Sequence, residues 1–165
     1  MGDITKSIDE AQKVLGKKLE HYDKYVKHVL SVKIDSEFDV PYFAGYNWAN
    51  TKIYIDKDAP EIVIICGKEL NLHRCLAMHE YVEKCHIDKG YTYAAAHEIA
   101  TKYERVYVKE QGTSWEDYNA VVCKLMHANW ISKLESVPHD LDMTPMEYCR
   151  DLKTLAKIRK IRAKK

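Results

Sequence analysis

Several features that would assign a protein to a common class are missing from this chain of 165 residues. The five cysteines are odd in number and include no CxxC pair, which favours free thiols in a reducing cytoplasm over disulfides. No apolar run approaches the length of a membrane span, and the N-terminus lacks the basic-then-apolar pattern of a secretory signal. No glycine-rich phosphate loop is present, which disfavours a nucleotide-dependent enzyme. We therefore expect a cytoplasmic protein without a membrane segment.

The composition indicates a globular chain with an uneven distribution of charge. Apolar residues make up 46% and charged residues 31%, and the length is typical of one domain. The net charge is +1, yet residues 153–165 contain seven Lys and Arg and no acid, which leaves −6 for the rest. We expect a single α+β domain over residues 1–152 and a basic tail over residues 153–165. Such a tail binds nucleic acid or simply forms a solvated terminal helix.

The first part of the chain predicts one helix and two hairpins. Apolar residues at three- to four-residue spacing over residues 4–30 predict a long amphipathic helix, with Asp3 as its N-cap. The segments PYFAGYN and TKIYID flank residues 48–50 and predict a β-hairpin. The segment EIVIICGKEL predicts a second, smaller hairpin that turns near Gly67.

The remaining chain predicts a set of helices. Asn71 is the expected cap of a helix that Gly90 ends, and a second helix follows over residues 91–110. A third helix is expected from Ser114 to about residue 136, and the segment TPME at residues 144–147 is expected to begin the last helix. The prediction is an α+β fold in which a long N-terminal helix and a small antiparallel sheet precede a helical bundle.

Two of these helices carry residues that chelate metal ions. His79 and Glu83 are four residues apart, so they share one face of the first helix. Glu83 lies seven residues before Gly90 and His97 lies seven after it. A helical hairpin that turns at this glycine brings the two side chains to the same height. We therefore expect His79, Glu83 and His97 to converge on one point.

Two further carboxylates lie close to this group. Glu80 is displaced by about 100° from His79 around the helix, where a general base flanks a metal ion instead of binding it. Glu104 lies one turn beyond Thr101, which is expected to face His79. Glu104 is thus a fourth candidate ligand, or a residue that orients a ligand from behind.

The helix bearing HEYVE at residues 79–83, preceded by a small sheet, resembles the core of the zincin metallopeptidases, whose signature is HExxH. In gluzincin-type members the third ligand is a glutamate on the following helix. Here the residue types are exchanged, because Glu83 replaces the second histidine and His97 is the third ligand. The resemblance covers residues 41–104 and implies one zinc ion per chain. The same stretches also resemble uncharacterised proteins of phage and bacterial genomes.

The resemblance implies a hydrolase of peptides or proteins. Glu80 would accept a proton from the attacking water and return it to the leaving group. The strand at residues 51–56 would present its edge to an extended peptide. Glu104, if it bound the metal directly, would close the site and indicate a structural metal, whereas contact with a ligand histidine would leave the site open.

Other interpretations remain open from the sequence. HExxE alone is a weak motif, because Glu and His are common on exposed helix faces. Glu83 and His86 form an ExxH unit of the di-iron type, but a second unit is missing. Cys85 and His86 could likewise form a zinc pair, with no second pair to complete it. Three function classes follow: a zinc-dependent peptidase, a non-catalytic metal-binding accessory protein of phage or bacterial origin, and a nucleic-acid-associated module.

Overall fold

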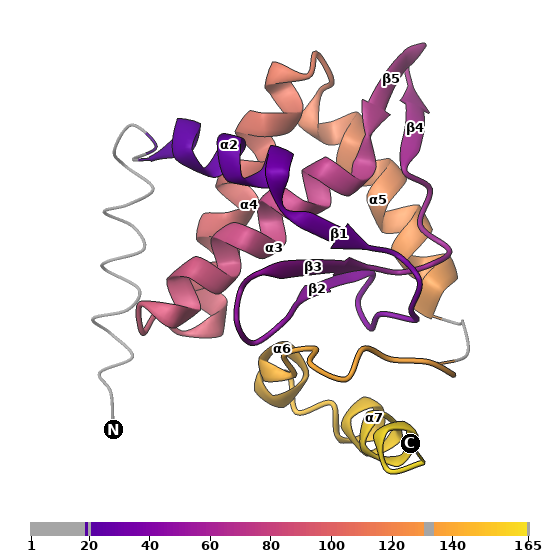
Figure 1. Cartoon of the computed structure of the whole chain (residues 1–165). Helices are drawn as coiled ribbons and strands as arrows, with labels where there is room; N and C mark the ends of the chain where they lie inside the picture. Colours follow the sequence, from indigo (N-terminus) through magenta and orange to yellow (C-terminus); the bar gives the residue numbers. More distant parts are fainter. Residues whose placement is uncertain (1–18, 20, 131–133, 165) are drawn as a thin grey trace.

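The computed structural model describes residue 19 and residues 21–130 and 134–164. It shows an α+β fold, as the sequence predicts, with a hairpin of two helices packed against a small sheet (Figure 1). Along the chain the elements are α2 (Tyr22–Ser31), β1 (Lys33–Asp35), β2 (Ala44–Tyr46), β3 (Lys52–Ile55), β4 (Ile62–Ile65), β5 (Lys68–Asn71), α3 (Leu72–Asp88), α4 (Tyr93–Glu110), α5 (Trp115–Trp130), α6 (Thr144–Tyr148) and α7 (Leu152–Arg162).

The N-terminal helix differs from its prediction. Of the span 4–30, residues 4–18 lie outside the described residues. Helix α2 begins at Tyr22, and His21 before it has a left-handed φ of 63°. A residue in that conformation cannot continue a right-handed helix, so the prediction of one unbroken helix through residue 21 is wrong.

Both predicted hairpins are confirmed, but the main sheet is mixed. Strands β2 and β3 pair antiparallel, and β1 pairs with β3 in parallel, giving the order β1-β3-β2. The prediction that residues 51–56 form an edge is therefore wrong, because β3 is the central strand. Strands β4 and β5 form a separate hairpin whose turn residues Cys66 and Gly67 have φ of 50° and 77°. Two positive φ values are typical of a type I′ hairpin turn.

The outer strand β2 is covered over part of its length. Asp142 donates a backbone hydrogen bond to the Tyr46 carbonyl (2.9 Å), and Trp48 donates one to Asp140 (3.2 Å). On the opposite side of β2, the Phe43 carbonyl accepts a hydrogen bond from the backbone N–H of Asp56, which directly follows β3 (2.9 Å). Because pairing directions alternate along a strand, the N–H and C=O of Ala44 point away from β3, and Ala44 lines the cavity described below.

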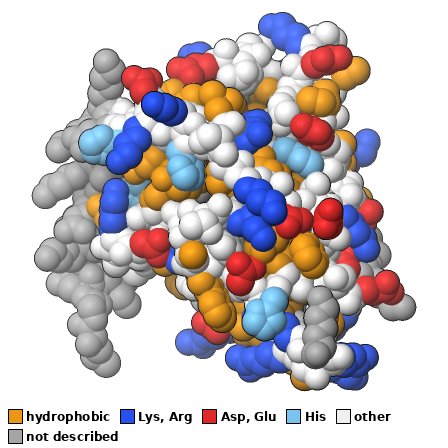
Figure 2. All heavy atoms as spheres, in the orientation of Figure 1, with side chains coloured by type: hydrophobic (Ala, Val, Ile, Leu, Met, Phe, Trp, Pro, Cys, Tyr) orange, Lys and Arg blue, Asp and Glu red, His pale blue; other side chains and the backbone are white. Residues whose placement is uncertain are grey.

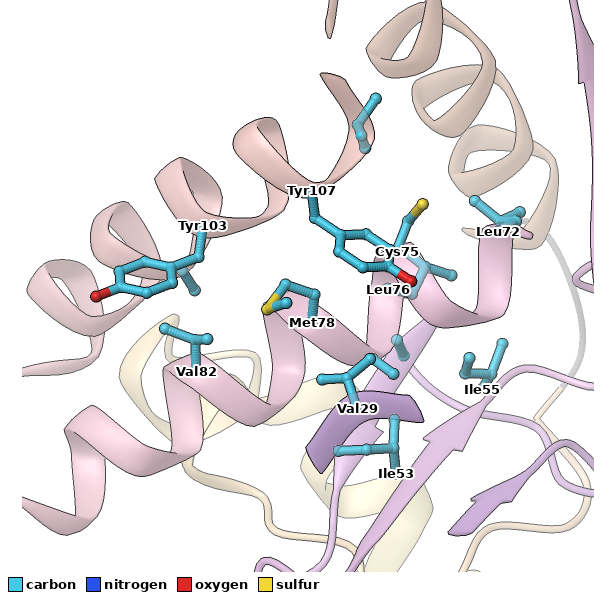
Figure 3. Packing of buried hydrophobic residues seen from close by; sticks show 14 of the residues in the cluster. Val29, Ile53, Ile55, Leu72, Cys75, Leu76, Met78, Val82, Tyr103 and Tyr107 are labelled. Carbon is cyan, nitrogen blue, oxygen red and sulfur yellow. The ribbon is translucent and has the colours of Figure 1, made fainter. Parts of the chain in front are cut away.

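Capping side chains and a glycine determine where the two helices of the hairpin begin and end, as the sequence predicts. The Asn71 side chain accepts from the backbone N–H of Arg74 (2.9 Å) and caps α3. Gly90 has a φ of 88°, a conformation that glycine adopts without strain. Thr92 caps α4, which begins at Tyr93 and not at residue 91. Figure 3 shows the core of this unit, which joins α3 and α4 to α2 and β3 through buried residues that include Val29, Ile53, Leu72, Met78, Val82 and Tyr103.

The C-terminal region differs from the prediction of one last helix. Helix α6 ends after one turn, and Arg150 has a left-handed φ of 53°. Asp151 then caps the separate helix α7. Residues 153–164 do not form a free tail, because Leu155 and Ile158 of α7 are buried in a second apolar cluster. Within the described ranges, no helix combines the length and the apolar character needed to cross a membrane.

Candidate metal centre

The three residues predicted as ligands meet between α3 and α4. The Nδ1 atom of His97 lies 2.8 Å from Glu83 Oε2 and 3.0 Å from His79 Nε2. The Nε2 atom of His79 lies 3.4 Å from Glu83 Oε2. These donor atoms all lie within 4.8 Å of one another and could hold a metal ion, as expected from the helical spacing.

The donor set fits a small divalent ion such as zinc. At Zn–N and Zn–O distances near 2.0–2.1 Å, tetrahedral coordination separates neighbouring ligand atoms by about 3.3 Å. The separations of 2.8, 3.0 and 3.4 Å between the donor atoms are close to this value. Two imidazoles and one carboxylate are also the ligand complement that catalytic zinc sites use, with a fourth position left for water or substrate.

Burial and charge hold the donors in place. Burial alone would lower the pKa of His79, but hydrogen bonds and charge from Glu104 and Glu83 raise it well above its ordinary value. Burial alone would raise the pKa of Glu83, but His79 and His97 hold it well below its usual range. These shifts favour a protonated His79 between Glu104 and Glu83, and a metal ion would displace that proton on binding.

Glu104 lies behind the group of donor atoms. Its Oε2 atom is 2.9 Å from Nδ1 of His79, the ring nitrogen opposite the one that faces Glu83 and His97. Its Oε1 atom accepts a hydrogen bond from the Tyr118 hydroxyl on α5 (2.5 Å). Of the two roles expected for Glu104, this geometry matches the residue that orients a ligand and not the ligand itself.

Tyr46 orients Glu83, the second candidate ligand, in a similar way. Its hydroxyl donates to Oε1 of Glu83 (3.0 Å), which leaves Oε2 directed at the two histidines. Neither Tyr46 nor Tyr118 could be predicted as part of the site, because neither has a spacing relation to the helical motifs. Each reaches the site only through the packing of β2 or α5 against the α3–α4 hairpin.

Glu80 lies beside the donor group without joining it. Its side chain lines the cavity described below, and no hydrogen bond to it is found within the described part of the chain. Burial, followed by the charge of Glu83, raises the pKa of Glu80 to about 8. An unpaired carboxylate with a raised pKa beside a ligand group is the pattern of a general base or acid.

The donor group opens into a cavity of about 520 Å³. The His97 side chain is 50% exposed, so the site is accessible from this side. Three parts of the chain form the wall of the cavity: the outer strand (Ala44, Gly45, Tyr46), helix α5 (Trp115, Val122, Met126), and helix α6 with its C-cap (Met146, Cys149). Its largely apolar lining with a few convergent polar groups is typical of a binding site.

The backbone at the rim of this cavity is strained. Tyr42 and Phe43, which directly precede β2, have φ of 61° and 80°. Two successive non-glycine residues in this region are unfavourable and occur mainly where the surrounding structure enforces them, often at functional sites. The Tyr42 hydroxyl donates to Asp151 at the start of α7 (2.7 Å), which ties the rim to the C-terminal helix.

Replacing Glu104 with glutamine is expected to weaken zinc binding by about 10–100-fold, the usual effect of losing a carboxylate behind a ligand histidine. The amide removes the negative charge that fixes His79 with Nε2 toward the donor group. Competition with a chromophoric chelator measures the affinity. Tyr107→Phe is the control, since it removes one polar group from a buried side chain of the same helix that does not line the cavity. Equal affinities for the Glu104→Gln protein and the wild type would contradict this role.

The alternative pair of Cys85 and His86 does not assemble. His86 is buried and its Nδ1 atom bonds the Val82 carbonyl of its own helix (2.7 Å). The Cys85 thiol contacts Asn50, at 3.4 Å. Neither side chain belongs to a cluster of metal-ligating groups within the described residues.

The candidate site thus consists of three donor atoms on α3 and α4, an unpaired Glu80 beside them, and a cavity walled by β2, α5 and α6. Glu104 and Tyr46 support the donors from outside the group. Comparisons of the chain with family models, with curated proteins and with solved structures found no match.

Proposed function

We propose that the protein is a zinc-dependent peptidase, in which His79, Glu83 and His97 hold one zinc ion per chain. The observation that carries this proposal is the position of Glu80, an unpaired carboxylate next to three convergent donor atoms in an open cavity. A structural metal site would not need a free carboxylate beside it. The resemblance of residues 79–83 to the zincin motif supports the same function.

The zinc ion and the protein side chains have different roles in the proposed reaction. A bound zinc ion would polarise the scissile carbonyl and lower the pKa of water toward about 7. Glu80 accepts a proton from the attacking water and then donates it to the leaving amine. Glu104 and Tyr46 keep His79 and Glu83 aligned during this cycle, through the 2.9 Å and 3.0 Å contacts described above.

The outer edge of β2 supports a peptide as the substrate. The N–H and C=O of Ala44 point away from β3, and Ala44, Gly45 and Tyr46 line the cavity next to the donor group. An extended peptide placed along this edge would form backbone hydrogen bonds as an additional strand. The edge at residues 51–56, expected from the sequence, is replaced in this proposal by β2. We place the reaction in the cytoplasm, because all five cysteines are free thiols.

The test combines metal analysis with cleavage of a peptide library by the full chain. The expected results are about one zinc ion per chain, loss of cleavage on treatment with a chelator, and its recovery when zinc is restored. Bound zinc without any cleavage would instead favour a non-catalytic accessory protein. Cleavage that continues undiminished without metal would refute the proposal.

A further inference from the structure

Helix α7 carries a surface whose composition differs from the rest of the molecule. Leu155 and Ile158 anchor the helix in the second apolar cluster. Arg162 adds two hydrogen bonds from its guanidinium, to the carbonyls of Pro138 and Leu141, each at 3.0 Å. The orientation of the helix on the domain is therefore fixed, and so is the direction of its outer face.

Three exposed lysines on that outer face and one just after the helix C-cap Ala163 form a row that we call the lysine stripe: Lys153, Lys157, Lys160 and Lys164. At about 100° per residue, the stripe falls within an arc of about 60° on the side of the helix opposite Leu155 and Ile158. At about 1.5 Å rise per residue it is about 16 Å long. Figure 2 shows Lys and Arg side chains gathered along the lower edge of the molecule, where Figure 1 places α7.

Most of the stripe lies away from acidic side chains, and only Lys153 is close enough to Asp151 to lower the pKa of that carboxyl, among the residues that the structure describes. No carboxylate among the described residues forms an ion pair within 4.0 Å of these lysines, whereas Lys57 and Lys84 do have such partners. Arg159 lies on the same helix and is also exposed. Residues 153–165 carry seven positive charges, against a net −6 for the rest of the chain. The positive charge of this segment therefore contrasts with the net negative charge of the rest of the chain.

We propose that the lysine stripe binds the phosphate backbone of nucleic acid, independently of base sequence. Double-stranded DNA carries one negative charge per about 1.7 Å of its axis, so a stripe of about 16 Å can face several phosphates at once. Lysine ammonium groups bind phosphates as point charges without reading base edges.

Other anionic partners fit this face less well. A membrane-surface helix places an apolar face in the lipid, but Leu155 and Ile158 of α7 are buried in the protein, and the exposed Leu152 alone does not make such a face. The centre of a protein–protein interface is rich in aromatic and apolar residues and poor in lysine, unlike the stripe. The metal site does not contribute to the stripe, so nucleic-acid binding does not depend on the proposed peptidase activity.

The experiment measures binding of the full chain to a fluorescent 20-base-pair DNA duplex over a range of salt concentrations. With four phosphate contacts, the slope of log K against log salt is expected to be about −3.6, so affinity falls about 150-fold from 50 to 200 mM salt. Each Lys→Gln substitution in the stripe is expected to reduce the slope by about 1. Changing all four should abolish the measurable salt dependence and leave only weak binding.

The matched control changes four exposed lysines elsewhere to glutamine, namely Lys24, Lys27, Lys109 and Lys124. It lowers the net charge equally and should retain the slope and affinity of the wild type. A second control, the wild type after treatment with a chelator, should also bind DNA normally. Absent or salt-independent binding by the wild type, equal loss in the two four-lysine variants, or binding only to anionic lipid vesicles would each overturn the proposal.

Discussion

Replacing His79 and His97 together with alanine is expected to remove the bound metal. His79 contacts Glu83, His97 and Glu104, so it connects the donor group to the carboxylate behind it. Loss of two of the three donors removes far more affinity than the 10–100-fold typical of a change behind a ligand. The substitution also leaves Glu104, which is 6% exposed, without the imidazole that neutralises it. A buried charge that loses its partner destabilises a protein by about 3–5 kcal/mol.

Two measurements separate these effects. Native mass spectrometry gives the zinc stoichiometry, and urea unfolding with and without zinc gives the stabilisation due to the metal. At a zinc concentration 100 times the dissociation constant, the wild type should gain about 2.7 kcal/mol, and the double variant should gain none. His86→Ala is the control, because this buried histidine of α3 bonds a backbone carbonyl and not the donor group. Full metal occupancy in the double variant would refute the assigned ligands.

The sequence predicts the ligand group because all the information needed is local. Helical periodicity fixes the face shared by His79 and Glu83, and the glycine at residue 90 fixes the turn that brings His97 to their height. The caps at Asn71 and Thr92 determine where both helices begin. None of these features depends on the packing of distant segments.

Tyr46 and strand β1 could not be placed from the sequence, because their positions depend on packing between segments that are far apart in the chain. Tyr46 lies 37 positions before Glu83, and its contact depends on how the sheet packs against α3. Strand β1 has only three residues and pairs in parallel with β3, which places β3 in the centre of the sheet. Such a short segment carries no clear alternation, and its partner cannot be identified from a single sequence.

Helix α7 shows how charge can obscure a packing pattern. Leu155, Ile158 and Ile161 recur every three residues, which is the spacing of a buried helix face. The surrounding lysines and arginines, however, are typical of a solvated tail, so the sequence alone favours that interpretation. In the structure the apolar residues pack inward and Arg162 bonds two carbonyls, so the charged and apolar faces of one helix have separate roles.

Replacing Glu80 with glutamine is expected to abolish peptide cleavage while leaving zinc bound. The amide matches the carboxylate in shape but cannot accept a proton from the attacking water, and losing a general base typically lowers the rate by about 10²–10⁴-fold. Because Glu80 lies outside the group of three donor atoms, zinc stoichiometry should stay at the wild-type value. Stability should not fall, since glutamine has the same shape and Glu80 lines the cavity without a hydrogen bond to the described part of the chain.

The same substitution at Glu98 provides the control, because this exposed glutamate is adjacent to His97 and outside the cavity lining. Glu98→Gln should retain both zinc and activity. If Glu80→Gln lost its zinc as well, Glu80 would be a ligand, and a fourth protein donor would make the site structural. If the variant cleaved peptides at the wild-type rate with zinc bound, another group would have to accept the proton. Only the retention of metal combined with the loss of cleavage assigns the general base to Glu80, because that pair of results separates proton transfer from metal binding.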